Sequence, residues 1–94
     1  MSDSIMQTEK ECYICKSTRW LERHHVFGGA YRKKSDTDGL TVYLCHWHHN
    51  EPPVGVHHNR ANMDRLRKKG QEAYMEHYGA TVEDFIREYG RNYL

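Results

Sequence analysis

Three cysteines and one histidine of this sequence have the spacing of ligands to a single metal ion. They form a C-x2-C pair and, further along the chain, a C-x2-H pair (Cys12 and Cys15; Cys45 and His48). A gap of two residues lets one turn of backbone bring both ligand atoms of a pair to one ion, and zinc favours tetrahedral sites of thiolates and imidazoles. We therefore predict a structural zinc site formed by these four residues.

A second group of histidines remains after the zinc ligands are assigned. His24 and His25 are adjacent, so a strand would send their side chains to opposite sides, one toward a metal and the other toward a substrate. His49 directly follows the last zinc ligand, and His57 or His58 offers a third imidazole after a Pro-Pro turn. We predict that His24, His49 and His57 hold a divalent metal with open positions for water and phosphate. The alternative is that these histidines are ordinary hydrogen-bonding surface residues.

The composition favours a small domain that needs a metal to fold. The chain has 94 residues, of which 37% are hydrophobic, and a mean hydropathy of −1.00, so little apolar material is available for a core. A structural zinc ion can supply about 10 kcal/mol or more of folding free energy in a small domain. The odd number of cysteines argues against disulfides, and neither a signal peptide nor a membrane span is evident. We expect a cytoplasmic protein that does not contact membranes.

The charge pattern points to local rather than bulk contacts with nucleic acid. A net charge of +1 is too small to coat nucleic acid by overall attraction. Cationic residues instead gather in a triplet and in a longer group on a predicted helix (Arg32, Lys33 and Lys34; Arg60, Arg65, Arg67, Lys68 and Lys69). The pattern alone leaves open whether these groups bind phosphates or form a solvated face.

Two strands are expected to carry the predicted ligands. Residues 20–27 are rich in β-forming side chains and should form a strand that ends at the histidine pair, before two glycines. Residues 40–44 predict a second strand that leads directly to Cys45. Residues 31–39, between the strands, are polar and charged and predict a solvent-exposed loop.

Helices are expected to follow the second strand. A short helix is predicted over residues 45–50, before two prolines that cannot continue it. Helical periodicity begins after Asn59 and stops at Gly79. Thr81 and Asp84 have the spacing of a capping box, and apolar residues then follow at helical intervals (Val82, Phe85, Ile86 and Tyr89).

The segments around the histidines resemble the HNH endonuclease superfamily. These segments are LERHHVFGG at residues 21–29, VYLCHWHHN at residues 42–50 and GVH at residues 55–57. They are most similar to the small phage-type HNH proteins related to the Ref recombination-enhancement nuclease, which the ending GRNYL at residues 90–94 also resembles. The resemblance covers about residues 12–58.

The resemblance implies an α+β fold with a small zinc-stapled ββα-metal core and two C-terminal helices. We expect the core in residues 12–58 and the helices in residues 59–94 of one nuclease-like domain, residues 12–94, after a flexible lead-in over residues 1–11.

The resemblance also implies roles for individual residues. By position, His24 would be a metal ligand, His25 the general base, and His49 and His57 the remaining ligands of one catalytic ion, which could be Mg²⁺, Mn²⁺, Ni²⁺ or Zn²⁺. The structural zinc ligands match the zinc knuckles of that family (Cys12, Cys15, Cys45 and His48). Four cationic residues would neutralise flanking phosphates without reading sequence (Arg23, Arg32, Lys33 and Lys34).

The activity implied by the resemblance is metal-dependent endonucleolytic hydrolysis of nucleic acid. We expect the substrate to be DNA and the protein to be phage-encoded, acting in the cytoplasm of a bacterial host. A second copy of the chain or a recombination protein is the expected protein partner.

One position departs from the family pattern and keeps other functions open. The middle Asn of the motif should fall just before the second strand, where this chain has Asp38, Gly39 and Leu40. Ser35, Asp36 or Asp38 could orient the base instead. The main alternative is a non-catalytic, zinc-stapled nucleic-acid-binding module or phage accessory or inhibitor protein derived from an HNH nuclease. A protein-interaction adaptor has the least support, from tyrosines near the C-terminus (Tyr74, Tyr78, Tyr89 and Tyr93).

Overall fold

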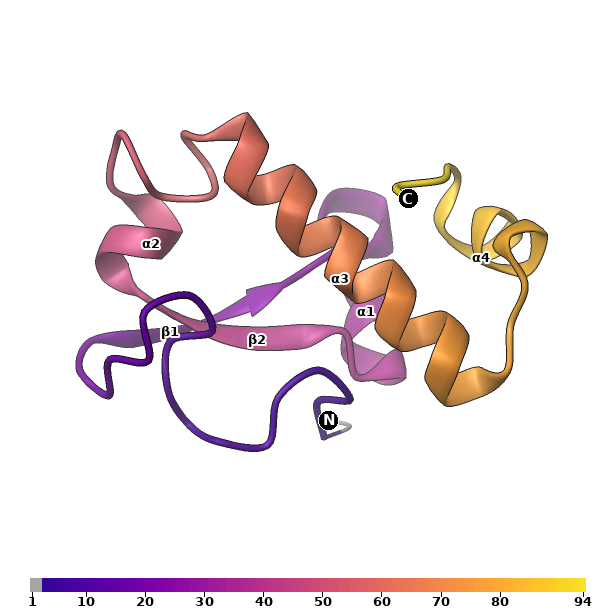
Figure 1. The fold of residues 1–94 in the computed structure, drawn as a ribbon, viewed down its shortest axis with the longest axis horizontal. Coiled ribbons are helices and arrows are strands. Elements are labelled where there is room, and N and C mark those ends of the chain that lie inside the picture. Colours follow the sequence, from indigo (N-terminus) through magenta and orange to yellow (C-terminus); the bar gives the residue numbers. More distant parts are fainter. Residues whose placement is uncertain (1–2) are drawn as a thin grey trace.

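Two antiparallel strands form a sheet that helices flank on either side (Figure 1). The computed structural model describes residues 3–94, so the first two residues of the expected lead-in lie outside the described residues. Within residues 3–94 the elements are β1 (Leu21–His25), the 3-10 helix η1 (Gly29–Tyr31), α1 (Arg32–Asp38), β2 (Thr41–Cys45), α2 (His46–Asn50), α3 (Arg60–Tyr78) and α4 (Val82–Tyr89). The chain therefore has a small α+β fold.

The register of the sheet brings the predicted ligands to its two ends. Leu21 pairs with Cys45 and His25 pairs with Thr41, so the start of β1 lies beside the end of β2. The predicted strands are confirmed with small shifts at their ends. The second strand begins one residue later than expected because the N–H of Leu40 donates to the carbonyl of Ser35 instead of entering the ladder.

The expectation of an exposed loop over residues 31–39 is wrong, because α1 occupies Arg32–Asp38. Ser35 is its one buried residue, and the Ser35 hydroxyl accepts a hydrogen bond from the N–H of Phe27. Gly39 ends the helix in the left-handed conformation, with φ of 80°. A helix that buries a serine among charged residues has no apolar periodicity, so its sequence resembles a loop.

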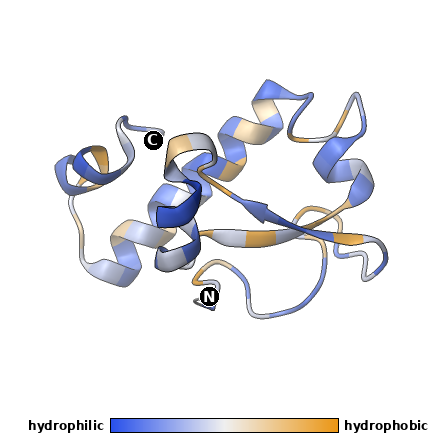
Figure 2. Cartoon of the chain, turned by 180° about the vertical axis from the view of Figure 1, so that it is seen from behind, coloured by the Kyte–Doolittle hydropathy of each residue, from blue (hydrophilic) through white to orange (hydrophobic). Residues whose placement is uncertain are grey.

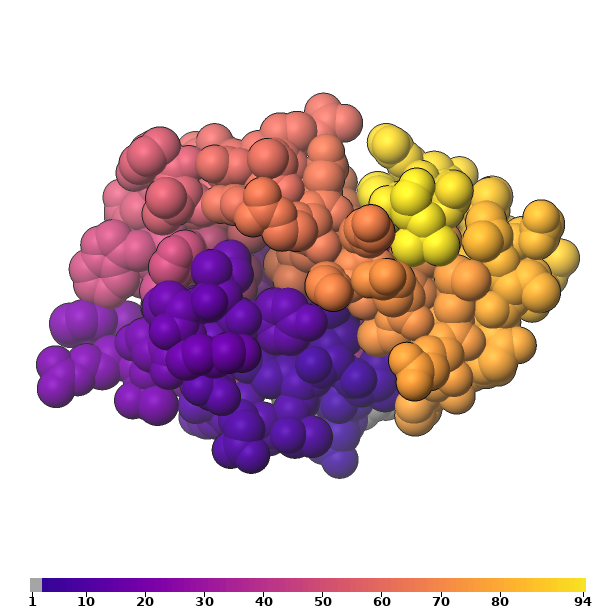
Figure 3. Space-filling view, in the orientation of Figure 1, coloured from indigo at the N-terminus to yellow at the C-terminus, as the bar shows by residue number. Residues whose placement is uncertain are grey.

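Residues 3–11, expected to be a flexible lead-in, lie against β2 and the turn before it. The Ser4 hydroxyl donates to the carbonyl of Thr41, the N–H of Ile5 donates to the carbonyl of Gly39, and the Gln7 side chain accepts from the N–H of Tyr43. Figure 3 shows this indigo segment against the molecule's front face. These contacts satisfy backbone groups that an open strand edge would leave to water.

The long helix α3 crosses close to the residue that follows β1. A Cβ atom on Gly70 would lie 2.8 Å from Cγ1 of Val26, so only glycine allows this approach. The predicted helix start and capping box are confirmed, since Asn59 accepts from the N–H of Asn62, and Thr81 and Asp84 bond each other's backbone.

The hydrophobic core is small and joins the sheet to α3 and α4. Its larger members come from the residues after β1, from β2 and the residue before it, from the loop before α3 and from both helices (Val26, Phe27, Leu40, Val42, Leu44, Val56, Leu66, Phe85 and Tyr89). Figure 2 shows the more hydrophobic residues in β2, while α1 and most of α3 are hydrophilic. Across residues 3–94, the helices lack the combination of length and apolar character that crossing a membrane requires.

Candidate metal centres

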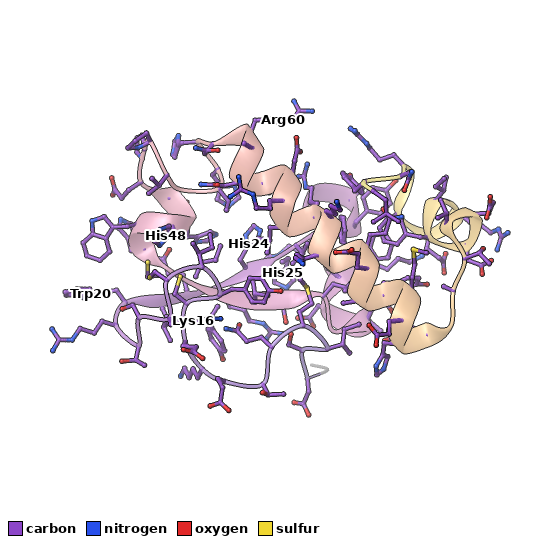
Figure 4. All side chains as sticks on the ribbon, in the orientation of Figure 1. Lys16, Trp20, His24, His25, His48 and Arg60 are labelled. Atoms are coloured by element: carbon purple, nitrogen blue, oxygen red, sulfur yellow. The ribbon has the colours of Figure 1, made fainter. Side chains whose placement is uncertain are left out.

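Cys12, Cys15, Cys45 and His48 form a cluster at the end of the sheet where β1 begins, and their ligand atoms lie within 4.8 Å of one another. Sγ of Cys15 lies 3.8 Å from Sγ of Cys45, which in turn lies 3.2 Å from Nδ1 of His48. A tetrahedral zinc site with Zn–S bonds of about 2.3 Å has sulfur–sulfur distances of about 3.8 Å. In Figure 4, His48 lies beside the yellow sulfur atoms. The structure confirms that the four predicted ligands lie close together, and the cluster could bind a metal such as zinc.

Local backbone geometry positions the first ligand pair of this Cys3His cluster. The N–H of Lys16 donates to the carbonyl of Cys12, which closes a tight turn, and Lys16 itself adopts a φ of 67°. Burial alone would raise the pKa of the Cys12 thiol. Hydrogen bonds from the backbone of Cys15, Cys45 and Ile14 outweigh this effect, so that pKa lies below its ordinary value. A lowered pKa favours the thiolate, which is the form that binds metals.

His24, His49 and His57 form a second cluster, again with ligand nitrogens within 4.8 Å of one another. His24 comes from β1, His49 from α2, and His57 from the loop before α3. Nε2 of His49 lies 3.1 Å from Nε2 of His57, and the His24 ring centre lies 5.1 and 5.3 Å from the other two. His24 is buried and His57 is exposed, so this histidine triad opens toward solvent on one side.

The burial and the lowered pKa of His24 indicate that the histidine triad fits a divalent metal ion. Nε2 of His24 is buried and has no hydrogen-bond partner, a condition that costs about 1–3 kcal/mol for a neutral polar group. Burial, followed by the charges of His49 and His57, lowers the pKa of His24 to about 3. Burial likewise lowers the pKa of His57. Neutral imidazoles with converging nitrogens are the form in which histidine ligates a metal.

Glu22 orients the triad and was not singled out from the sequence. Its Oε1 lies 2.7 Å from Nδ1 of His49 and its Oε2 lies 3.1 Å from Nδ1 of His46. The bond to His49, followed by that to His46, lowers the pKa of the Glu22 carboxyl. Because Nδ1 of His49 is engaged, its Nε2 faces His57. Its position in the sequence could have indicated this role, because Glu22 is two residues before His24 and therefore lies on the same face of β1.

His25 lies on the other face of β1 and is not part of the triad. Its Nε2 lies 3.2 Å from Oδ1 of Asp36, and Arg23 donates to the same oxygen at 2.9 Å. Of the residues considered as substitutes for the missing Asn, only Asp36 contacts His25 among the hydrogen bonds of residues 3–94. Ser35 bonds the backbone after β1, and Asp38 accepts from Tyr89.

An open pocket lies beside His25. It is lined by three cationic residues, by Asp36 and by residues of the turn after β1 (Arg23, His25, Gly29, Ala30, Arg32, Lys33 and Asp36). Lys34, predicted to bind phosphates, instead points to α4, where Nζ lies 2.7 Å from Oε2 of Glu88. Three of the four cationic residues expected to contact nucleic acid are thus brought together with the expected base.

Comparison with models of protein families, with curated proteins and with solved structures finds no match for this chain. The two clusters and the surroundings of His25 are therefore the observations from which a function can be proposed.

Proposed function

We propose that the protein is a metal-dependent endonuclease with an HNH-type ββα-metal core, and that its substrate is DNA. The observation that carries the proposal is the buried, unpartnered Nε2 of His24, which converges with ring nitrogens of His49 and His57. The next residue, His25, lies in a cationic pocket and contacts a carboxylate. The choice of DNA rests on the resemblance of the motifs.

The histidine triad would hold the catalytic ion, with Glu22 fixing the orientation of His49. Three imidazole ligands favour zinc, nickel or another transition metal over magnesium, which prefers oxygen. Such an ion, when bound, would polarise the scissile phosphate and stabilise the leaving 3′ oxygen. The Cys3His cluster would hold the structural zinc ion.

His25 would accept a proton from the attacking water. A tautomer in which Nε2–H donates to Asp36 leaves Nδ1 as the proton acceptor, and the Asp36 carboxylate then stabilises the imidazolium that forms. Arg32 and Lys33, which line the same pocket, would bind neighbouring phosphates of the strand. Asp36 on α1 thereby takes the orienting role that the middle Asn of the motif has in the family.

The test is cleavage of supercoiled plasmid by the zinc-containing protein with added Ni²⁺, Mn²⁺, Zn²⁺ or Mg²⁺. His25→Ala should cleave about 100 to 10,000 times more slowly than wild type, because the proton acceptor is lost. His77→Ala, at an exposed position on α3, is the matched control and should cleave normally. If His25→Ala cleaves as fast as wild type, the hydrolytic mechanism is wrong and a non-catalytic nucleic-acid-binding module is the better assignment.

A further inference from the structure

Arg67 lies on the part of α3 that packs next to the strand carrying His24. One turn after Arg67, the close approach of Gly70 to Val26 and Phe27 places α3 against the residues that directly follow the histidine pair. In Figure 4, His24 lies next to this helix. Arg67 precedes Gly70 by three residues and His24 precedes Val26 by two, so both residues are adjacent to the contact between α3 and the end of β1. The guanidinium of Arg67 is therefore a candidate to contact a ligand bound at the triad.

Within residues 3–94 Arg67 has no carboxylate partner, whereas Arg60 and Lys69 of the same helix each have one. Arg60 pairs with Asp64 and Lys69 with Glu72, each within one turn of α3. None of the ion pairs found in residues 3–94 includes Arg67, and its buried Nε has no hydrogen-bond partner. A half-buried cation with an unpartnered hydrogen-bond donor destabilises the fold unless an anion binds to it.

The C-terminal segment holds Arg67 in place. The Tyr93 ring centre lies 5.7 Å from Cζ of Arg67, and Tyr93 also packs against Phe27. Gln71, one turn after Arg67 and fully buried, accepts from the N–H of Tyr93 and donates to Oδ1 of Asn92. In Figure 1 the yellow C-terminal end reaches back toward α3. The aromatic ring thus restricts the guanidinium while leaving its hydrogen-bond donors for a ligand.

We propose that Arg67 binds an oxygen of a phosphate group that binds to the metal ion of the histidine triad, and that Tyr93 and Gln71 position the Arg67 side chain. This inference rests on the proposed function, since it needs a metal at the triad. A guanidinium suits phosphate because its donors match two phosphate oxygens. The same charge repels a divalent cation at the triad, so the metal and an anion should bind together more tightly than the metal alone.

The experiment measures Ni²⁺ binding to the zinc-containing protein by calorimetry, with and without inorganic phosphate. Wild type should bind Ni²⁺ more tightly when phosphate is present. Arg67→Gln should lose this enhancement, with phosphate affinity for the Ni²⁺-loaded protein falling roughly tenfold or more, as expected for one charge-assisted hydrogen bond. Without phosphate, Arg67→Gln should bind Ni²⁺ more tightly than wild type. A merely structural arginine would not produce these opposite changes.

Two further variants separate charge from geometry. Lys68→Gln removes the same charge from a neighbouring exposed position and should leave both affinities unchanged. Arg67→Lys keeps the charge and should retain the wild-type Ni²⁺ affinity but only part of the phosphate enhancement. If Arg67→Gln weakens Ni²⁺ binding, or Lys68→Gln matches its effects, the role of Arg67 is refuted while the metal centre stands. If wild type binds no Ni²⁺ beyond the Cys3His cluster, the metal centre is refuted and the role of Arg67 with it.

Discussion

His48 and His49 are adjacent on α2, yet each contributes to a different cluster. Successive residues on a helix are separated by about 100° around its axis, so neighbouring side chains leave in different directions. Nδ1 of His48 lies near the sulfurs of Cys12 and Cys45, while Nδ1 of His49 contacts Glu22. His48 therefore faces its cluster with Nδ1, whereas His49 faces the triad with Nε2. The helix α2 thus joins the two candidate metal centres.

We predict opposite consequences for His48→Ala and His49→Ala. His48→Ala removes a ligand from the proposed structural zinc ion and should lower stability by several kcal/mol, because the ion's binding free energy would be part of the folding free energy. His49→Ala should unfold near the wild-type temperature but lose Ni²⁺ binding at the triad and plasmid cleavage. Thermal denaturation and calorimetry distinguish the two. The reverse pattern would mean that the two histidines are assigned to the wrong centres.

At the scale of elements, α4 supports the helix that carries Asp36. The hydroxyl of Tyr89, a buried residue of α4, donates to Oδ2 of Asp38 at the end of α1, and Lys34 of α1 pairs with Glu88. Burial, followed by the bond to Asp38, raises the pKa of Tyr89. The C-terminal helices therefore hold α1, and with it Asp36, at the His25 pocket.

Tyr89→Phe should lower stability by about 1–3 kcal/mol, because it removes a buried donor and leaves Asp38 with an unmet acceptor. The raised pKa of Tyr89 also predicts a pH dependence. The stability that its neutral hydroxyl contributes is present below about pH 10, the pKa of an unfolded tyrosine, and is lost as the pH rises above that value. Urea denaturation at pH 8 and pH 11 should therefore show that the free energy of unfolding decreases less between these pH values for Tyr89→Phe than for wild type.

Tyr31→Phe is the matched control for this prediction, since none of the hydrogen bonds of residues 3–94 uses the Tyr31 hydroxyl. The Tyr31→Phe variant should have nearly the wild-type stability at pH 8. Its free energy of unfolding should decrease between pH 8 and pH 11 by as much as that of wild type. An equal decrease in wild type and Tyr89→Phe would show that Tyr89 does not ionise on unfolding in this range.

At the scale of the whole molecule, the Cys3His cluster joins segments that the small core alone holds weakly. It connects the turn at Cys12 and Cys15 to the junction of β2 and α2. His24 reaches the triad from β1, His49 from α2, and His57 from the loop after α2, so the geometry of the triad depends on this junction. Loss of the proposed zinc ion should therefore disturb both centres.

Cys15→Ser should unfold the domain, although Cys15 is exposed. Surface substitutions usually change stability by about 0.5 kcal/mol or less, so a large loss would identify the thiolate as a metal ligand. Chelation of the wild-type protein should likewise abolish its circular dichroism signal for helix, and added zinc should restore it. Metal analysis should find one tightly held zinc per wild-type chain. Unchanged zinc content and melting temperature in Cys15→Ser would contradict a structural zinc site.

Residue patterns within one turn or one strand were readable from the sequence. The C-x2-C and C-x2-H pairs, the strand that ends at the histidine pair and the Thr81 capping box all depend on neighbours a few residues apart. Local spacing also suggested which histidines could meet, because a strand end and a short helix next to a shared ligand pair restrict where the chain can go.

Features that depend on distant segments were decided only by the tertiary structure. Asp36 was one of several substitutes for the missing Asn until α1 placed its carboxylate next to His25. Glu22 and Arg67 have no local motif, because their roles come from partners on other elements. The helix α1 was missed because its one buried residue is a serine, and the N-terminal segment was missed because its partners are backbone groups of β2. Such contacts carry no periodic signal, since only the folded chain brings the partners together.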